Sequence, residues 1–204
     1  MKLHPTRPVL LLACMLSACT ALPSAPVRPA VYDFGPGALT LSARTRPGLS
    51  PIVLQEVAAP VALESAAMLY RLVYADPQQL RPYAQARWSM PPAQLVRQRL
   101  RESLSRERAV LDPNETSAPL VLRIELQEFS QLFDSAEQSR GLVRLRATLV
   151  EVKDGADRFL AQRLFVVQRP APSADAPGGV RALTAATDAA LEEISAWLRQ
   201  QPAK

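Results

Sequence analysis

The chain has 204 residues, of which 48% are hydrophobic and 21% are charged. This composition is typical of a globular protein with a hydrophobic core, and it excludes a chain that is disordered throughout. Lys and Arg number 24 against 19 Asp and Glu, a net charge of +5, but aromatic residues make up only 5% and no run of basic residues occurs, which argues against a nucleic-acid partner.

Residues 1–18 have the organisation of an export signal, with a basic start and an apolar run at residues 9–16 that is too short to span a bilayer. The run ends in Leu16-Ser17-Ala18-Cys19, which resembles the bacterial lipobox, where the Cys sulfur receives a diacylglyceryl group and the chain is cut before the Cys. We therefore expect a lipoprotein attached to the membrane through Cys19. The alternative is an ordinary secretory signal that a cysteine happens to follow. Thr20 stands where an Asp would resemble an inner-membrane retention signal, which favours the outer membrane.

The chain that follows the predicted signal peptide divides into two parts. Residues 19–30 comprise the lipidated cysteine and a Pro-rich stretch without apolar periodicity, which indicates a stiff, extended tether of about 3.1 Å per residue. Residues 31–204 have the patterns of a single periplasmic domain.

The residue inventory of this predicted mature chain limits its chemistry. The only histidine and one of the two cysteines leave with residues 1–18, and lipidation occupies the other cysteine. Ser-His-Asp triads, Cys-His pairs and histidine metal sites are therefore excluded. A hydrolase with two carboxylates is still compatible, and Glu125 and Glu128 are candidates that the sequence does not distinguish from solvated charges. We expect a protein that is not an enzyme and that binds no metal or cofactor.

Six strands and two helices are predicted in the domain. Strands are indicated by β-branched runs or by alternation of apolar and polar residues, and helices by apolar residues three and four apart. Strands are expected at residues 31–34, 51–57, 67–74, 120–126, 143–149 and 159–168, and helices from Pro91-Pro92 to about Arg108 and from Val180 to Gln200.

This order predicts the fold class. The last three strands follow one another directly, which is typical of an antiparallel meander. The order β-β-β-α-β-β-β-α indicates an α+β fold in which an antiparallel or mixed sheet has both helices packed on one face.

Each helix has an apolar stripe that should face the sheet. On the first helix the stripe is Val96, Leu100 and Leu104, and the charged residues Arg97, Arg99, Arg101 and Glu102 are expected outside it. On the last helix the stripe is Leu183, Thr187, Ala190, Leu191, Ile194 and Leu198.

Several short motifs occur in the order found in one family. They are Tyr32-Asp33-Phe34-Gly35 after the lipobox, Val57 to Pro60, Met68 to Arg71, Leu80 to Tyr83, and Arg87-Trp88 before Pro91-Pro92 and a Leu-rich helix. In this order they resemble the ABC-type transport auxiliary lipoproteins, the PqiC-like family. The resemblance covers essentially the whole mature domain and is strongest over residues 52–104.

The resemblance implies an outer-membrane lipoprotein of a phospholipid-transport system. Its partners would be an MCE-domain periplasmic protein and, in some systems, an ABC permease and ATPase, and the family has no known catalytic residues. The implied role is to dock or cap the outer-membrane end of the lipid conduit. Because such conduits are rings, a homo-oligomer would fit this role.

The positions that match the family are Tyr70, Arg71, Tyr83, Arg87 and Trp88. Trp, Tyr and Arg are enriched at interface hot spots, so these residues are candidates for contact with the partner. The alternative interpretation is structural, with the aromatic side chains packed over the first helix and the arginines neutralising a carboxylate or a helix end.

Two further questions remain open in the sequence. Arg123, Arg144 and Arg146 alternate along predicted strands, and they would face either lipid phosphates, an acidic partner or only solvent. The anchor and the predicted fold also suit an assembly lipoprotein that partners an outer-membrane β-barrel, in the manner of LptE-like proteins. Such a protein would copurify with a β-barrel and not with an MCE protein.

Overall fold

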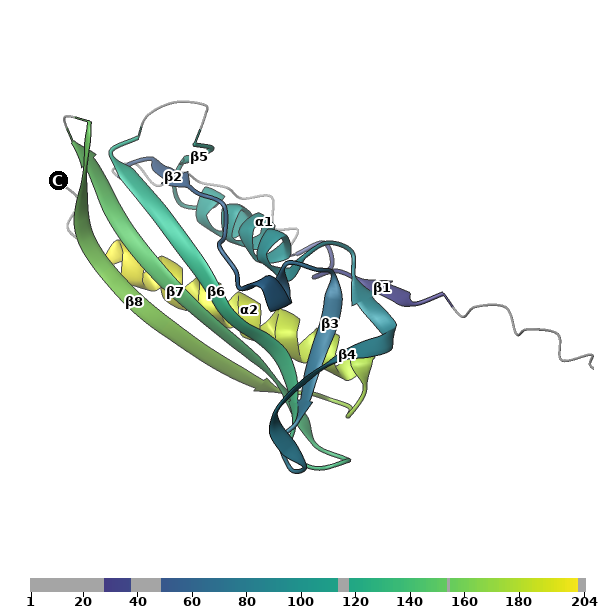
Figure 1. Ribbon diagram of the computed structural model, residues 1–204. Coiled ribbons are helices and arrows are strands. Elements are labelled where there is room, and N and C mark those ends of the chain that lie inside the picture. Colours follow the sequence, from purple (N-terminus) through teal and green to yellow (C-terminus); the bar gives the residue numbers. More distant parts are fainter. Residues whose placement is uncertain (1–27, 38–48, 114–117, 154, 202–204) are drawn as a thin grey trace, which may run out of the picture.

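The computed structural model describes residues 28–37, 49–113, 118–153 and 155–201. One mixed sheet carries two α-helices on a single face (Figure 1). In chain order the elements are β1 (Ala30–Tyr32), β2 (Ile52–Leu54), a short 3-10 helix (Val61–Leu63), β3 (Ala67–Leu72), β4 (Asp76–Trp88), α1 (Pro92–Ser105), β5 (Val110–Leu111), β6 (Leu120–Phe133), β7 (Ser139–Lys153), β8 (Ala156–Pro170) and α2 (Ala176–Arg199). The predicted α+β class is confirmed.

Strand β6 joins the two halves of the sheet. Along one edge it pairs antiparallel with β7, which pairs antiparallel with β8, so the predicted meander is confirmed. Along its other edge β6 pairs parallel with β2 near its start and with β3 near its end. Leu122, Ile124 and Leu126 are buried because alternate side chains of this strand face the helices.

Strand β4 is not predicted by the sequence patterns, and it adds a fourth strand before α1. It pairs antiparallel with β3, and only its last three residues pair with β1. Most of its outer edge therefore meets no neighbouring strand among the described residues, which is where Pro77 and Pro82 cost no ladder hydrogen bond. Because most of the strand is exposed, it lacks the alternation by which the other strands are recognised.

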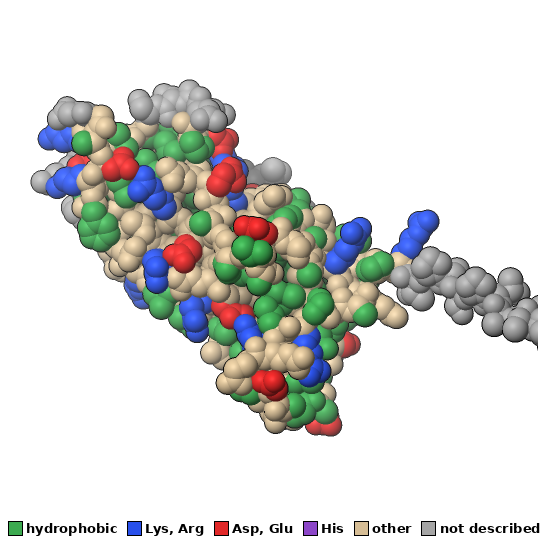
Figure 2. Space-filling model, in the orientation of Figure 1, with side chains coloured by type: hydrophobic (Ala, Val, Ile, Leu, Met, Phe, Trp, Pro, Cys, Tyr) green, Lys and Arg blue, Asp and Glu red, His purple; other side chains and the backbone are tan. Residues whose placement is uncertain are grey.

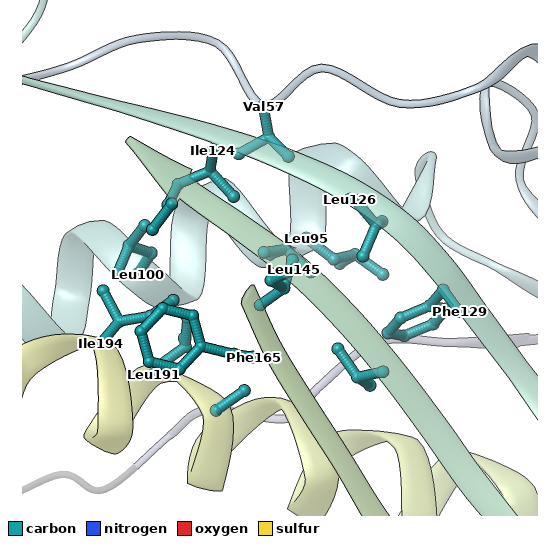
Figure 3. Close-up of a cluster of buried hydrophobic side chains, with 14 of the residues drawn as sticks. Val57, Leu95, Leu100, Ile124, Leu126, Phe129, Leu145, Phe165, Leu191 and Ile194 are labelled. Carbon is teal, nitrogen blue, oxygen red and sulfur yellow. The ribbon is translucent and has the colours of Figure 1, made fainter. Parts of the chain in front are cut away.

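The predicted helix stripes form the core with the sheet. Leu100 on α1 and Ile194 on α2 are both fully buried, and Figure 3 shows them close to Phe165 of β8. Helix α2 packs on β6, β7 and β8, and α1 lies beside α2. Pro92 at the first turn of α1 and the Asp175 cap of α2 are favourable helix starts.

Helix α2 approaches the sheet closely at Gly141 of β7. A Cβ atom added to Gly141 would lie 2.7 Å from both the carbonyl carbon of Ala182 and the backbone nitrogen of Leu183. Only a residue without a side chain fits between the two backbones. Neither α-helix covers the opposite face of the sheet, which we call the open face, and Figure 2 shows basic and acidic side chains interspersed over it.

Candidate functional site

Three of the five family-like residues meet at the hairpin formed by β3 and β4. The ring centroids of Tyr70 and Tyr83 are 4.7 Å apart, and Tyr70 also contacts Phe133 of β6 with centroids 5.8 Å apart. Both tyrosines are half-buried, and Tyr74 in the turn of the hairpin is 53% exposed. We call Tyr70, Tyr74 and Tyr83 the hairpin tyrosines.

Tyr83 is held by a buried polar network. Its hydroxyl donates to Gln131 Oε1 at 2.8 Å, and Gln131 is fully buried. The Gln131 amide donates in turn to Ser139 Oγ at 2.8 Å and to the carbonyl of Asp175 at 3.1 Å. Burial, with a smaller contribution from Tyr70, raises the pKa of the Tyr83 phenol above its ordinary value, so the phenol keeps the proton that it donates. The network joins β4, β6, β7 and the start of α2.

Arg71, on β3, stabilises the hairpin through contacts with β4 and with β6. Its guanidinium donates to the carbonyl of Gln78 at 3.2 Å and forms an ion pair with Glu128 of β6 at 3.4 Å. It therefore ties the two strands of the hairpin to the centre of the sheet. This is the structural role that the sequence offered as the alternative for an arginine.

Trp88 and Arg87 lie at the other end of β4, away from the hairpin turn. Trp88 is 1% exposed and packs edge-on against Phe34 and Phe129, with ring centroids 5.7 Å and 5.5 Å away. It packs in the core, so it offers a partner no surface in this conformation. Arg87 is exposed, pairs in register with Val31 of β1, and forms no ion pair with a described residue.

Two of the three strand arginines form ion pairs on the open face of the sheet. Arg123 pairs with Asp157 at 2.6 Å, and Arg146 pairs with Glu125 at 3.2 Å. For these two, neutralisation within the sheet face explains the charge. Arg144 is exposed and has no carboxylate partner among the described residues. Of the two carboxylates considered for a hydrolase, Glu125 thus pairs with Arg146, and Glu128 pairs with Arg71 and also accepts from Ser130 at 2.7 Å.

Arg99 is a residue whose position the sequence analysis predicted wrongly. It is only 9% exposed and not on the outer face of α1, because it follows Leu95 by four residues and Val96 by three. Its Nη2 donates to the carbonyl oxygen of Phe34 at 2.7 Å, and its Nε lies 3.0 Å from Asp188 of α2. Burial raises the pKa of Asp188, and Arg99 opposes that shift.

Two hollows flank Arg99. One of about 240 Å³ is bounded by Phe34, Met90 and Leu95, and one of about 430 Å³ lies between α1 and α2 and is bounded by Pro36, Asp188 and other residues. Both contain arginine and carboxylate groups that already pair with each other. The described residues contain no group of three or more Cys, His, Asp and Glu side chains placed to hold a metal ion.

Cys19 lies outside the described residues, so the structure does not place it. Neither α1 nor α2, nor any other helix in the described part of the chain, has both the length and the hydrophobicity needed to cross a membrane.

Comparisons with solved structures identify the fold. Protein XCC0632 from Xanthomonas campestris superposes with a TM-score of 0.63 at 20% identity, covering 75% of this chain and 88% of that one. An uncharacterized protein gives a TM-score of 0.62 at 16% identity, covering 85% and 98%. The hypothetical protein CT253 from Chlamydia trachomatis gives 0.52 at 10% identity, covering 75% and 98%. At these identities the likeness shows a shared fold alone.

Comparison with sequence families is more specific. No curated protein matches the chain. Residues 32–195, however, match the family model described as the ABC-type transport auxiliary lipoprotein component. The match spans β2 to β8 and most of α2, and it is the family that the motifs from Tyr32 to the Leu-rich helix resemble. The chain therefore belongs to the ABC-type transport auxiliary lipoprotein family.

Proposed function

We propose that the protein is the outer-membrane lipoprotein of an MCE-type phospholipid-transport system, where it docks the periplasmic end of the lipid conduit and supports envelope integrity. The observation that carries this proposal is the family match over residues 32–195, because that family serves ABC-type transport as an auxiliary lipoprotein. The partners are an MCE-domain periplasmic protein and, in the same system, an ABC permease and ATPase. The protein acts by binding and not by catalysis.

The proposed attachment follows from the sequence before the described domain. Residues 1–18 are the signal peptide, Cys19 carries the lipid, residues 19–30 form the tether, and residues 31–204 form the periplasmic domain. Several acyl chains on one cysteine give a stable anchor, whereas a single chain holds a protein only marginally. An extended tether of this length reaches about 30 Å from the membrane. Confinement to this layer raises the effective concentration of the domain for its partner, so a weak docking contact suffices.

The proposed docking surface comprises the hairpin tyrosines and Arg87. Tyr70 packs against Phe133, and Tyr83 donates a hydrogen bond to Gln131, so these two rings are held in place before a partner arrives, whereas Tyr74 is exposed in the turn. Rigid aromatic side chains lose little conformational freedom on binding and are enriched at interface hot spots. Trp88 contributes indirectly, because its buried side chain anchors the end of β4, the strand that also carries Tyr83 and Arg87.

Site-specific crosslinking in cells tests this proposal. A photo-crosslinking amino acid is placed at Tyr74 or Arg87, which are exposed, and at Glu193 of α2 as an exposed control on the helix side of the molecule. We expect the MCE-domain protein to be captured from the first two positions and not from the control. Capture of a β-barrel component from both positions, without any MCE-domain protein, would replace this proposal by the assembly-lipoprotein alternative.

A further inference from the structure

Strand β8 forms a long edge of the sheet that no described residue pairs with. It pairs with β7 along one side only, and Figure 1 shows it as the outermost strand of the meander. Natural edge strands are usually protected by lysines, internal prolines or bulges. From Ala161 to Arg169 this strand contains no lysine and no proline, and its register with β7 is unbroken.

The direction of the free backbone groups follows from the pairing. Ala171 N donates to the carbonyl of Ser139 at 2.8 Å, directly after the register pair of Pro170 with Arg140. In an antiparallel ladder, hydrogen-bonded and non-hydrogen-bonded pairs alternate. The odd-numbered residues of this stretch therefore bond to β7, and the even-numbered residues turn their N–H and C=O groups toward the open edge. These residues are Gln162, Leu164, Val166 and Gln168.

The two faces of this edge strand expose different side chains, with Leu164 and Val166 between two glutamines on the open face and two arginines on the helix side. Leu164 and Val166 are 50% and 48% exposed on the open face of the sheet. On the helix side, Arg163 lies over the ring of Phe165, with its guanidinium carbon 5.0 Å from the ring centroid, and Arg169 follows on the same side of the strand. Both arginines are exposed, and neither forms an ion pair with a described residue.

We propose that the β8 edge, residues 161–169, binds an extended acidic segment of a partner protein as an added strand. The unpaired N–H and C=O groups supply the main-chain hydrogen bonds of strand addition. Carboxylates on one side of the added strand meet Arg163 and Arg169, and apolar side chains on its other side cover Leu164 and Val166. This inference goes beyond the proposed function and does not depend on it, because no conduit is needed for the site to bind a peptide.

Charge distinguishes this occupant from a second copy of the chain. Residues 161–169 contain two arginines and no acidic residue, so self-pairing about a two-fold axis would place four arginines along one seam with no carboxylate in the paired segment. A membrane would provide phosphates for the arginines, but it offers no ordered partner for a row of backbone groups. An added acidic strand would pair with the free backbone groups and also neutralise the two arginines.

A binding experiment with the lipidated full-length protein in detergent tests the proposal. The probe is a fluorescent nine-residue peptide that alternates Glu and Val, and the reference peptide alternates Lys and Val. We expect the acidic peptide alone to bind and to protect the amides of Gln162, Leu164, Val166 and Gln168 from hydrogen exchange. Val166→Pro should weaken binding about tenfold or more, because it removes an outward N–H while leaving the bonds to β7. Val166→Ala keeps that N–H and should change binding by less than about threefold.

A second variant keeps the test valid if the proline disturbs the fold. Arg163→Gln combined with Arg169→Gln changes two exposed side chains without ion pairs, and it should weaken the acidic peptide by at least about tenfold. The proposal would be overturned if the acidic peptide did not bind, or if it bound and none of these variants changed its affinity. It would also be overturned if the peptide did not bind while phosphatidylglycerol vesicles or self-association protected the same amides.

Discussion

The guanidinium of Arg99 donates a hydrogen bond of 2.7 Å to the carbonyl oxygen of Phe34, across 65 residues of chain. The same side chain reaches Asp188 of α2, so one buried cation joins the segment after β1 to both helices. Arg99 therefore links the segment that follows β1 to the core beneath the two helices.

Arg99→Ala should lower the free energy of unfolding by about 2 to 4 kcal/mol, because it leaves the Phe34 carbonyl and the partly buried Asp188 carboxylate without their cation. The measurement is denaturant unfolding of the full chain. Gln98→Ala is the matched control, since Gln98 is exposed on the same helix, and it should change stability by less than about 0.5 kcal/mol. Equal effects of the two variants would show that the Arg99 contacts do not stabilise the fold.

Gly141→Ala should destabilise the protein by about 3 kcal/mol, because its Cβ would collide with the backbone of α2 at Ala182 and Leu183. The control is Gly155→Ala, which meets open space but has a φ of 77°. That variant should cost only about 1 kcal/mol, the strain of a left-handed conformation. Thermal unfolding of both variants checks the order, and a larger loss for Gly155→Ala would contradict the close packing of α2 on β7.

Tyr83→Phe and Tyr70→Phe separate the effect of the buried hydrogen-bond network from that of the contact between the two rings. Loss of the Tyr83 hydroxyl leaves the buried Gln131 oxygen without its donor and should cost about 1 to 2 kcal/mol. The Tyr70 hydroxyl has no hydrogen-bond partner among the described residues, so Tyr70→Phe should be nearly neutral. Chemical denaturation gives both values. If the two losses were the same, the Tyr83–Gln131 hydrogen bond would not be formed in solution.

The cap of α2 should depend on pH. Asp175 accepts hydrogen bonds from Ser173 Oγ at 2.6 Å and from Gly178 N at 2.7 Å, and these bonds lower the pKa of its carboxyl below the ordinary value of an aspartate. The folded state therefore binds this proton less readily than the unfolded state does. The stabilisation is present above the unfolded pKa and is lost as pH falls through the lower, folded pKa.

Asp175→Ala should cost about 1 kcal/mol near pH 7, and this difference from the wild type should be smaller near about pH 2, where the neutral carboxyl is a weaker acceptor than the carboxylate. Asp175→Asn keeps an acceptor at the cap and should stay within a few tenths of a kcal/mol of the wild type near pH 7. Unfolding curves at both pH values provide the test. A penalty for Asp175→Ala that is independent of pH would mean that the carboxylate charge is not part of the cap.

The parts of the fold that the sequence predicts are those in which one face of an element is buried. Leu122, Ile124 and Leu126 alternate with polar residues because β6 has a core face and an open face. Leu100 and Ile194 each belong to an apolar stripe with helical spacing, because only one face of each helix packs on the sheet. Strand β4 escapes prediction because most of it is exposed and it contains two prolines.

Long-range partners decide the remaining positions. Arg99 lies beside the apolar stripe of α1, and only Phe34 and Asp188, which are distant in sequence, make its burial favourable. Arg71 and Tyr83 could be recognised as members of a motif, but their partners Glu128 and Gln131 are supplied by β6. No local pattern identifies those contacts or the burial of Trp88 beneath Phe34 and Phe129.

We propose above that the protein is a lipoprotein that docks an MCE-type conduit. The most direct test of this proposal is affinity purification of the tagged lipoprotein from detergent-solubilised envelopes, with the copurifying proteins quantified by mass spectrometry. We expect strong enrichment of an MCE-domain protein, and a reduction of that enrichment by Tyr74→Ala combined with Arg87→Ala but not by Glu193→Ala. Enrichment of an outer-membrane β-barrel without any MCE-domain protein would contradict it.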